Sequence, residues 1–403
     1  MAGTTFRRCT KCHARWMPQD RACPVCGGPR ATWCYLTRVP APEGGKRQVR
    51  KTGFTTQRAA QQALRELQQE VDQERYVPPT KMTLEAYLEQ EWLPARRRVV
   101  RATTWSQQAM LMRAYVIPRI GKSGLQTLPP TRLNALYAEL EANGRRDGKG
   151  GLSPKSVHHV HRTLHRALKD AVRWGFASRN VAALADAPVL SAGEHAVWTP
   201  EQLRHFLTTA RGNRNFAYFL VLAGTGMRRG EGLGLKWTDL DLEQGLATKV
   251  VRQLTVADSA RVWSEPKTAK GRRPLTLDPL AVEALKRHRA RQAQERLMAG
   301  SRWRDHDLVF PKLNGEAQHP EAVSKYFKRL CLAAGLPHIG LHGLRHTYAT
   351  VALDRGVPTK VVSEQLGHSR TSITEDLYMH PTDDHRRESA LRVADHLYGG
   401  LAL

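Results

Sequence analysis

Apolar positions along this chain of 403 residues follow two periods, and each period predicts one kind of element. Apolar and polar residues alternate over 32–39, which is typical of a strand, and the basic run Lys46–Lys51 is predicted to be a second strand after a glycine-containing turn. A stripe of apolar residues at helical spacing then follows Thr55 and Thr56, either of which can cap a helix. The pattern therefore predicts a short sheet backed by one helix.

Helical spacing dominates the middle of the chain, from Met82 to about Asp186, where prolines and glycines divide it into several helices. The last helix is the best defined, because Ser153 can cap it and Pro154 suits its first turn. Basic residues and histidines surround its apolar face. Such a helix can lie along a phosphate backbone, or it can simply present a solvated basic surface.

The C-terminal part mixes helices with short strands. Thr199 and Pro200 are predicted to cap and open its first helix, and a long helix is predicted to start at Asp278. Between them the pattern predicts two strands joined around 266–273, where proline, glycine and basic residues gather. The fold class we expect is a multidomain, mainly α-helical protein with small β-sheets.

Composition indicates a polyanionic partner. The chain has 63 Lys and Arg residues against 37 Asp and Glu residues, which gives a formal net charge of +26. An excess of this size is typical of nucleic-acid binding, although a basic enzyme of another class or a ribosome-associated protein would share it. No uninterrupted apolar run reaches membrane-spanning length. We therefore expect no membrane partner and a cytoplasmic location.

Four of the six cysteines form two Cys-x2-Cys pairs near the N-terminus, Cys9 with Cys12 and Cys23 with Cys26. Two such turns can place four thiolates around one ion, which suits a structural Zn²⁺ site, and a pair of redox-active motifs is the alternative. A segment this short cannot bury a core, so a bound metal would supply its folding energy. We expect structural zinc at these cysteines; whether the module binds DNA or only stabilises the terminus stays open.

Residue types suited to phosphodiester chemistry recur in the C-terminal half. Gly-Thr-Gly-Met-Arg ends at Arg228, and Leu-Gly-His ends at His368. Between them, Leu-His-Gly-Leu-Arg contains His342 and Arg345, which are three positions apart and so share a face of a helix. Tyr378 follows His368 by ten residues. Two arginines, two histidines and a tyrosine in this order suit the breaking of a phosphodiester by a tyrosine.

These motifs make residues 195–395 resemble the tyrosine recombinase family, the integrases of phages and mobile elements, and the preceding region resembles it more weakly. The resemblance implies that Arg228 is the first catalytic arginine, that Glu231 supports it, and that Lys267 is the catalytic lysine of a β-hairpin. The other implied catalytic residues are His342, Arg345, His368 and Tyr378. Nearby basic residues expected to contact phosphates or solvent are Lys270, Arg272 and Arg273.

The implied chemistry fits the side chains. Arginines supply charged, forked donors for nonbridging phosphate oxygens, and histidines transfer protons near neutral pH. The phenol oxygen of Tyr378 would attack the phosphorus, and Lys267 would protonate the departing 5′ oxygen. The product would be a 3′-phosphotyrosine, whose reversal on another 5′ hydroxyl rejoins DNA. We expect catalysis to need no cofactor.

The resemblance also implies an order of domains along the chain. We expect a zinc-ribbon-like module over 1–30, an arm-type DNA-binding domain over 31–77, a helical core-binding domain over 82–186 and a mixed α+β catalytic domain over 195–403. The expected function is site-specific integration or excision of a mobile element. The expected partners are double-stranded DNA with core and arm sites, further copies of the chain in a homotetramer, and an accessory directionality or host DNA-bending factor.

Two other functions stay open from the sequence. A type IB topoisomerase shares the implied chemistry, but it would relax supercoils without partner sites. A DNA-binding regulator could carry a vestigial catalytic domain, although every catalytic residue type is present here.

Overall fold

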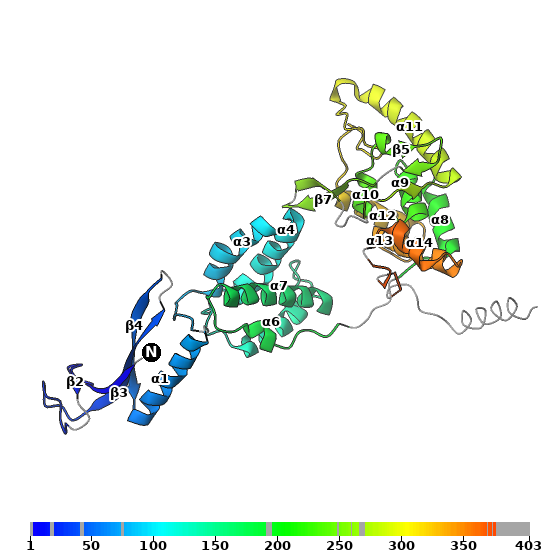
Figure 1. Cartoon of the computed structure of the whole chain (residues 1–403). Coiled ribbons are helices and arrows are strands. Elements are labelled where there is room, and N and C mark those ends of the chain that lie inside the picture. Colours follow the sequence, from blue (N-terminus) through cyan, green and yellow to red (C-terminus); the bar gives the residue numbers. More distant parts are fainter. Residues whose placement is uncertain are drawn as a thin grey trace, which may run out of the picture. The chain divides into compact units, whose positions relative to one another are not determined.

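The computed structural model divides the chain into two compact units, Met1–Ser191 and Ala192–Leu403, and we describe each by itself. Figure 1 gives the order of the elements. In the part of the chain described below, no helix combines the length and the apolar character that a membrane crossing requires. The structure describes residues 3–16, 20–40, 44–73, 76–190, 196–247, 250–258, 260–265, 271–368, 370–372 and 374–375.

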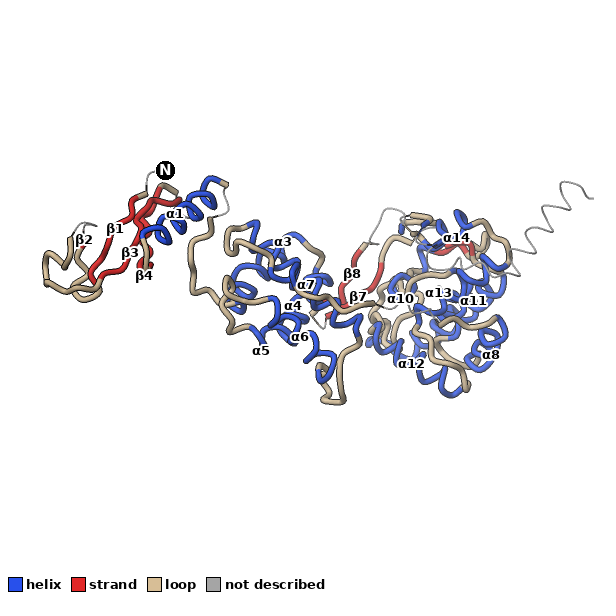
Figure 2. The backbone as a smooth tube through the Cα atoms, turned by 90° about the horizontal axis from the view of Figure 1, so that it is seen from below, coloured by secondary structure: helices blue, strands red, loops and turns tan. Residues whose placement is uncertain are grey.

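A four-stranded antiparallel sheet backed by one helix opens the first unit (Figure 2). Its elements are β1 (Thr4–Cys9), β2 (Arg15–Trp16), β3 (Ala31–Pro40), β4 (Lys46–Phe54) and α1 (Gln57–Asp72). The strand order is β2-β1-β3-β4. Thr56 caps α1 by accepting a hydrogen bond from the backbone N–H of Ala59, and the helix packs Leu64 and Leu67 against Tyr35 of the sheet. The predicted sheet with one backing helix is therefore present.

The sheet contains strands from both sides of residue 30, where we predicted the boundary between the zinc-ribbon-like module and the arm-type domain. β1 lies in the cysteine-rich segment, yet it pairs with β3 from Thr4 opposite Leu36 to Cys9 opposite Ala31. Only Phe6 in the interior of β1 is strongly apolar, so the alternation that marks a strand is weak there. Pairing across such a sequence distance has no local signal, and the predicted boundary falls between two strands of one sheet.

A bundle of short helices with its own core forms the rest of the first unit. Its elements are α2 (Leu84–Ala86), η1 (Tyr87–Trp92), α3 (Leu93–Val99), α4 (Ala102–Leu111), η2 (Met112–Val116), α5 (Ile117–Ile120), α6 (Pro130–Asn143), α7 (Pro154–Arg173) and η3 (Val181–Leu184). Ser153 caps α7 as predicted, by accepting from the backbone N–H of Ser156. In the core, the Trp92 indole N–H donates to Asp170 at 3.2 Å, so both buried polar groups are satisfied.

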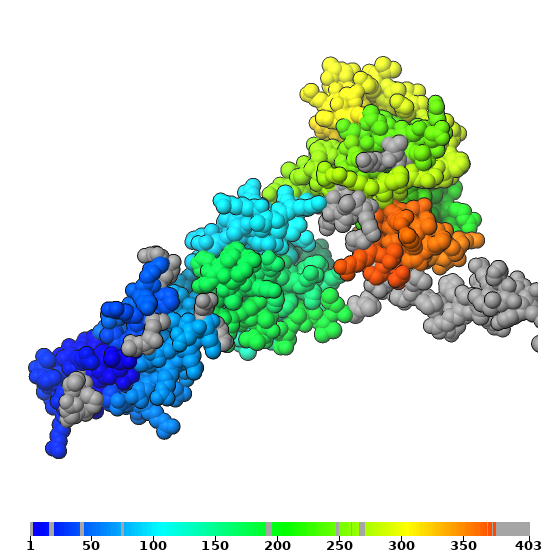
Figure 3. Space-filling model, in the orientation of Figure 1, coloured from blue at the N-terminus to red at the C-terminus, as the bar shows by residue number. Residues whose placement is uncertain are grey.

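The second unit surrounds α9 with other helices and two small sheets. Its helices are α8 (Pro200–Ala210), α9 (Phe216–Thr225), α10 (Arg229–Leu233), η4 (Trp237–Asp239), α11 (Pro279–Ala299), η6 (Gly300–Arg302), α12 (Pro320–Ala333), α13 (Leu341–Asp354) and α14 (Thr359–Leu366). Thr199 caps α8 and Asp278 caps α11, as predicted. Rings of Phe206, Phe219 and Phe327 meet in the core at centroid distances of 5.1–5.6 Å. Figure 3 shows the surface formed by α13 and α14 in orange.

The turn predicted between the two strands of this unit is in the wrong place. The strands are β5 (Leu240–Asp241), β6 (Leu246–Ala247), β7 (Gln253–Ala257), β8 (Ala260–Ser264) and β9 (Leu275–Thr276). β7 pairs with β8 around Asp258, whose φ is +49°, rather than around 266–273. β9 pairs with β6 instead. The Pro-Lys-Thr-Ala-Lys-Gly run is a stronger turn signal than Ala-Asp-Ser, so the sequence pattern favoured the later position.

Candidate functional site

Three segments far apart in the sequence meet at the C-terminal end of α9. The Nη1 atom of Arg345, in α13, donates to the carbonyl of Gly226 at 2.9 Å. The Nη2 atom of Arg228, just before α10, donates to the carbonyl of Gly367 at 3.4 Å. His368 follows directly, so the ends of α9 and α14 and the middle of α13 form one site. These contacts bring together residues that the sequence analysis had selected from separate motifs.

Gly226 makes this close approach of helices sterically feasible. It ends α9 with a φ of +64°, in the left-handed region that favours glycine. A Cβ atom added there would lie 2.7 Å from Leu366 Cδ2 and 2.8 Å from Tyr348 Cδ1. Those two side chains come from α14 and α13, so a larger residue at 226 would push both helices away from α9.

A buried carboxylate fixes the first arginine. Glu231 has only 1% of its surface exposed, and it accepts hydrogen bonds from the Arg228 backbone N–H at 3.0 Å and from Arg228 Nη1 at 2.8 Å. Burial opposes ionisation, but the charges of Arg273 and Arg228 outweigh it and hold the pKa of Glu231 below its ordinary value. Glu231 is therefore an anion that orients Arg228, whose own side chain stays 35% exposed. The predicted supporting contact is present.

The expectation that Arg273 contacts phosphates or solvent is wrong. Its side chain is buried; Nη2 donates to Glu231 at 3.2 Å, Nη1 to the carbonyl of Gly271 at 3.2 Å, and Nε to the carbonyl of Gln365. Arg273 thus neutralises the second oxygen of Glu231 and links the segment before β9 to α14. The neighbouring Arg272 is exposed and pairs with Glu265. The expected pairing of Glu231 with Arg228 was the one signal for this role, because a glutamate buried beside an arginine often needs a second cation.

His368 is a buried, neutral imidazole. It is 8% exposed, and its Nδ1 lies 2.8 Å from Thr374 Oγ1. Burial, followed by the positive charges of Arg345 and Arg228, lowers the pKa of His368 to about 4. The ring therefore carries no charge near neutral pH, and Thr374, which sequence reasoning missed, fixes its orientation.

The two candidate residues of α13 differ in exposure. Arg345 is 1% exposed, whereas His342 is exposed in the first turn of the helix. The ring of His346 meets the His342 ring edge-on at a centroid distance of 4.8 Å. This contact orients the His342 ring. Because His342 lies in the exposed first turn of α13, its ring can reach a ligand outside the protein. The remaining predicted residues, Lys267, Lys270 and Tyr378, lie outside the described residues.

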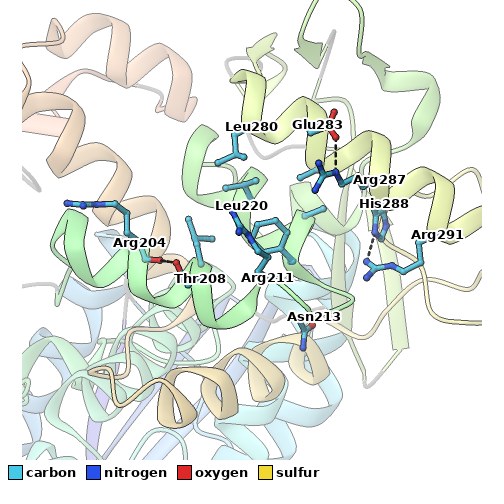
Figure 4. A pocket seen from close by; sticks show the side chains of 14 residues that line it. Arg204, Thr208, Arg211, Asn213, Leu220, Leu280, Glu283, Arg287, His288 and Arg291 are labelled. Carbon is cyan, nitrogen blue, oxygen red and sulfur yellow. Dashed lines mark hydrogen bonds and ion pairs between the residues drawn. The ribbon is translucent and has the colours of Figure 1, made fainter.

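A cavity of about 580 Å³ lies elsewhere in the second unit, between α8, α9 and α11. Figure 4 shows arginines at its rim, with Arg287 bonded to Glu283 and Arg291 to His288. None of the described candidate residues lines this cavity, so it is separate from the site at the end of α9.

The four N-terminal cysteines have the arrangement of a metal centre. Their sulfur atoms all lie within 4.8 Å of one another, with Cys9 Sγ 3.5 Å from Cys26 Sγ and Cys12 Sγ 3.4 Å from Cys23 Sγ. Tetrahedral zinc with Zn–S bonds of about 2.3 Å has S–S edges of about 3.8 Å, so these distances are close to those of a cluster that holds the ion. Backbone hydrogen bonds from Cys12 and Lys11 lower the pKa of Cys9 to about 6, which favours a thiolate there. For Cys12, a backbone hydrogen bond from Ala14 lowers the pKa, but contact with Cys23 and burial outweigh it and raise the pKa, so the thiols of the metal-free cluster share their protons unequally.

Comparison with known proteins finds a family match within the second unit. Residues 196–385 match the model of the phage integrase family. A tyrosine recombinase XerC-like protein of Caldanaerobacter subterraneus subsp. tengcongensis is 33% identical over 247 residues, which cover 57% of this chain and 63% of that protein. An integrase of Streptomyces ambofaciens is 29% identical over 365 residues, 87% of this chain and 89% of that protein.

A solved structure shares the fold over most of the chain. The integrase of transposon Tn1549, in complex with transposon right-end DNA, aligns with a TM-score of 0.64 at 24% identity. The alignment covers 78% of this chain and 100% of that one. Its extent includes more than the matched family domain, so the helical region before that domain shares the fold as well.

Proposed function

We propose that this chain, whose residues 196–385 match the phage integrase family, is a tyrosine recombinase that integrates or excises a mobile element. In this proposal it cleaves and rejoins DNA at specific sites through a 3′-phosphotyrosine intermediate. The observation that carries the proposal is the convergence of Arg228, Arg345 and His368 at the ends of α9 and α14.

The two arginines are proposed to bind the nonbridging oxygens of the scissile phosphate. Both are permanently charged and offer forked donors that match phosphate geometry. Negative charge grows on those oxygens in the transition state, and donors fixed in advance stabilise it without reorganisation. Glu231 and the Gly226 carbonyl supply this fixation, because each holds one arginine by a hydrogen bond of 2.8–2.9 Å.

The histidines are proposed to handle protons and to orient the phosphate. His368 is neutral near pH 7, and its Nδ1 is engaged by Thr374, so Nε2 is the nitrogen it offers to the substrate. His342, exposed at the start of α13, donates a second hydrogen bond from outside. A neutral and an exposed imidazole together can accept the phenol proton and hold the oxyanion.

Tyr378 is proposed as the nucleophile on its spacing from His368, and Lys267 as the general acid on the resemblance to the tyrosine recombinase family. The Tyr378 oxygen forms a bond to phosphorus while the bond from phosphorus to the 5′ oxygen breaks. The phenol proton passes to a neighbouring base, and Lys267 gives a proton to the departing 5′ oxygen. Attack by another 5′ hydroxyl reverses these steps and rejoins DNA, so the energy of the ester bond is kept.

The partners follow from this chemistry. We propose double-stranded DNA as substrate, with arm sites bound by 31–77 and core sites bound between 82–186 and 195–403. Integration joins two duplexes, so four copies of the chain are proposed to act together, with an accessory factor setting direction. The Tn1549 integrase was solved with DNA bound, which supports the same substrate class here. A DNA substrate also favours action in the cytoplasm.

A covalent trapping experiment tests the proposal. In a duplex with a crossover site and a nick just downstream of the cleavage position, attack releases a short fragment that carries the new 5′ hydroxyl. This fragment diffuses away and cannot rejoin the strand, so the protein should stay attached. Unaltered protein should form a denaturation-resistant adduct, and Tyr378→Phe should bind the same duplex without forming one. An adduct from the phenylalanine variant would refute the assignment of the nucleophile.

A further inference from the structure

The sheet of the first unit has one face under α1 and one open face. Tyr35 and Val39 of β3 pack on α1. Side chains alternate along a strand, so Leu36 and Arg38 point to the open face, and residues directly opposite them in β4 share it. Arg50 lies opposite Leu36. The open face is therefore defined by register and not by exposure alone.

The two strands from the cysteine-rich segment continue this face. Phe6 of β1 lies opposite Cys34, two positions from Leu36, and Arg8 is two positions from Phe6 on the same side. Arg15 of β2 lies opposite Arg8, and its guanidinium stacks on the Phe6 ring at 4.7 Å. The basic residues of the open face, which come from all four strands, are Arg8, Arg15, Arg38, Lys46 and Arg50.

The charge of this face is uniformly positive. None of the residues in the four strands is acidic. Burial raises the pKa of Cys34, and the positive charges of Arg8, Arg50 and Arg15 oppose that rise. Three guanidinium groups from three strands thus lie within electrostatic reach of one thiol, so they form one patch.

The four-cysteine cluster lies next to Arg8 and Arg15 along the chain. Cys9 ends β1, and its backbone N–H donates to the Ala14 carbonyl at 3.0 Å, while Arg8 Nε donates to the His13 carbonyl at 2.9 Å. The turn between β1 and β2 therefore contains the ligand Cys12 and follows the ligand Cys9. Among the residues that the structure describes, β2 has two residues and pairs with β1 alone, so pairing is a weak hold on it.

In the proposed recombinase this open face contacts double-stranded DNA, and we propose that metal binding extends the contact by holding Arg8 and Arg15 in line with the β3–β4 hairpin. The inference rests on the proposed recombinase function, in which 31–77 binds arm sites. Four strands about 4.8 Å apart span about 14 Å, which exceeds the major-groove width of about 12 Å. The hairpin enters the groove, and the outer arginines meet phosphates at its edge.

The salt dependence of binding to mixed-sequence duplex DNA tests this surface on the full-length protein. The slope of log K against log salt is negative, and each lost phosphate contact should reduce its magnitude by about 0.9. Arg15→Gln should reduce the magnitude of the slope by about 0.9, and the Arg8→Gln/Arg15→Gln double variant should reduce it by about 1.8. Arg15→Lys keeps the charge and should keep the slope. Lys51→Gln is the matched control, because Lys51 lies opposite Tyr35 on the α1 face.

Metal removal provides the second arm of the experiment. Protein stripped of metal by a chelator, with metal analysis confirming the loss, should show the slope of the double arginine variant. An unchanged slope in Arg15→Gln, or an equal loss in Lys51→Gln, overturns the surface. Metal-free protein that keeps the full slope overturns the metal dependence. Covalent trapping on a nicked crossover site is measured separately, so failure of the recombinase proposal would appear there and not in these slopes.

Discussion

Arg228 and Glu231 form an ion pair of 2.8 Å in which the carboxylate is buried and the guanidinium is still partly exposed. The asymmetry has a functional consequence. Removing a charge from water costs several kcal/mol, so Glu231 stays ionised only because two arginines surround it. Arg273 compensates Glu231 from within the protein, which leaves the outer side of Arg228 available for a phosphate.

Replacing the inner arginine should therefore destabilise the second unit. Arg273→Gln leaves Glu231 with one partner, and loss of one member of a buried pair typically costs about 3–5 kcal/mol. Urea denaturation should show a loss of that size in the free energy of unfolding. Arg272→Gln removes an exposed pair with Glu265, and such pairs contribute about 0–1 kcal/mol. Equal effects from the two substitutions would contradict the buried role of Arg273.

The sequence pointed to side chains that the structure brings together, but not to the residues that hold them in place. Motifs that resemble the tyrosine recombinase family selected Arg228, Arg345 and His368, and the structure brings these three side chains to the ends of α9 and α14. The supporting roles of Arg273 and Thr374 were not predicted. Arg273 acts on Glu231 and Gln365, which lie far from it in the sequence, and the contact of Thr374 with His368 has no sequence motif of its own. The pairing of β1 with β3 was not predicted either, because it joins segments that are distant in the sequence. Capping signals are local, and those at Ser153 and Thr199 correctly predicted where two helices start.

Gly226 gives a prediction that separates backbone strain from steric conflict. Gly226→Ala meets the left-handed φ of +64° and also the side chains of Leu366 and Tyr348. Gly335 has the same φ, but a Cβ there has nothing within 4 Å. Strain alone costs about 1–2 kcal/mol at either position. Gly226→Ala should lose more stability than Gly335→Ala, and only Gly226→Ala should slow adduct formation; equal results would exclude the packing role.

His368 predicts a loss of stability in mild acid. Its folded pKa of about 4 lies below the ordinary value of 6.5, so between these values the folded state binds fewer protons than the unfolded state. Stability from this group is therefore complete above about pH 6.5 and declines as the pH falls towards 4, by at most about 1.4 kcal/mol per pH unit. His368→Gln should flatten that decline in urea titrations at several pH values. An equally steep decline in the variant would show that other groups cause it.

Zinc should be bound but should not take part in cleavage. Freshly prepared, reduced protein should contain one zinc per chain, and Cys23→Ser should lower that content. Trapping on a nicked crossover site should proceed in metal-free protein, because the four cysteines belong to the first unit and the arginine–histidine site to the second. Loss of trapping on chelation, restored by added zinc, would place the metal in the catalytic pathway. Metal analysis and adduct yield are the two measurements.

Lys267 is predicted to protonate the departing 5′ oxygen, since an alkoxide leaves poorly without a proton. Lys267→Ala should slow cleavage of ordinary DNA by about a hundredfold to ten-thousandfold. A substrate with sulfur at the 5′ bridging position should recover most of that loss, because a thiolate leaves without protonation. Arg228→Ala is the control, and sulfur should not rescue it, because Arg228 acts on the nonbridging oxygens. Lys270→Ala tests the nearest alternative: rescue of that variant alone would assign the acid to Lys270, and rescue of neither lysine variant would place the acid elsewhere.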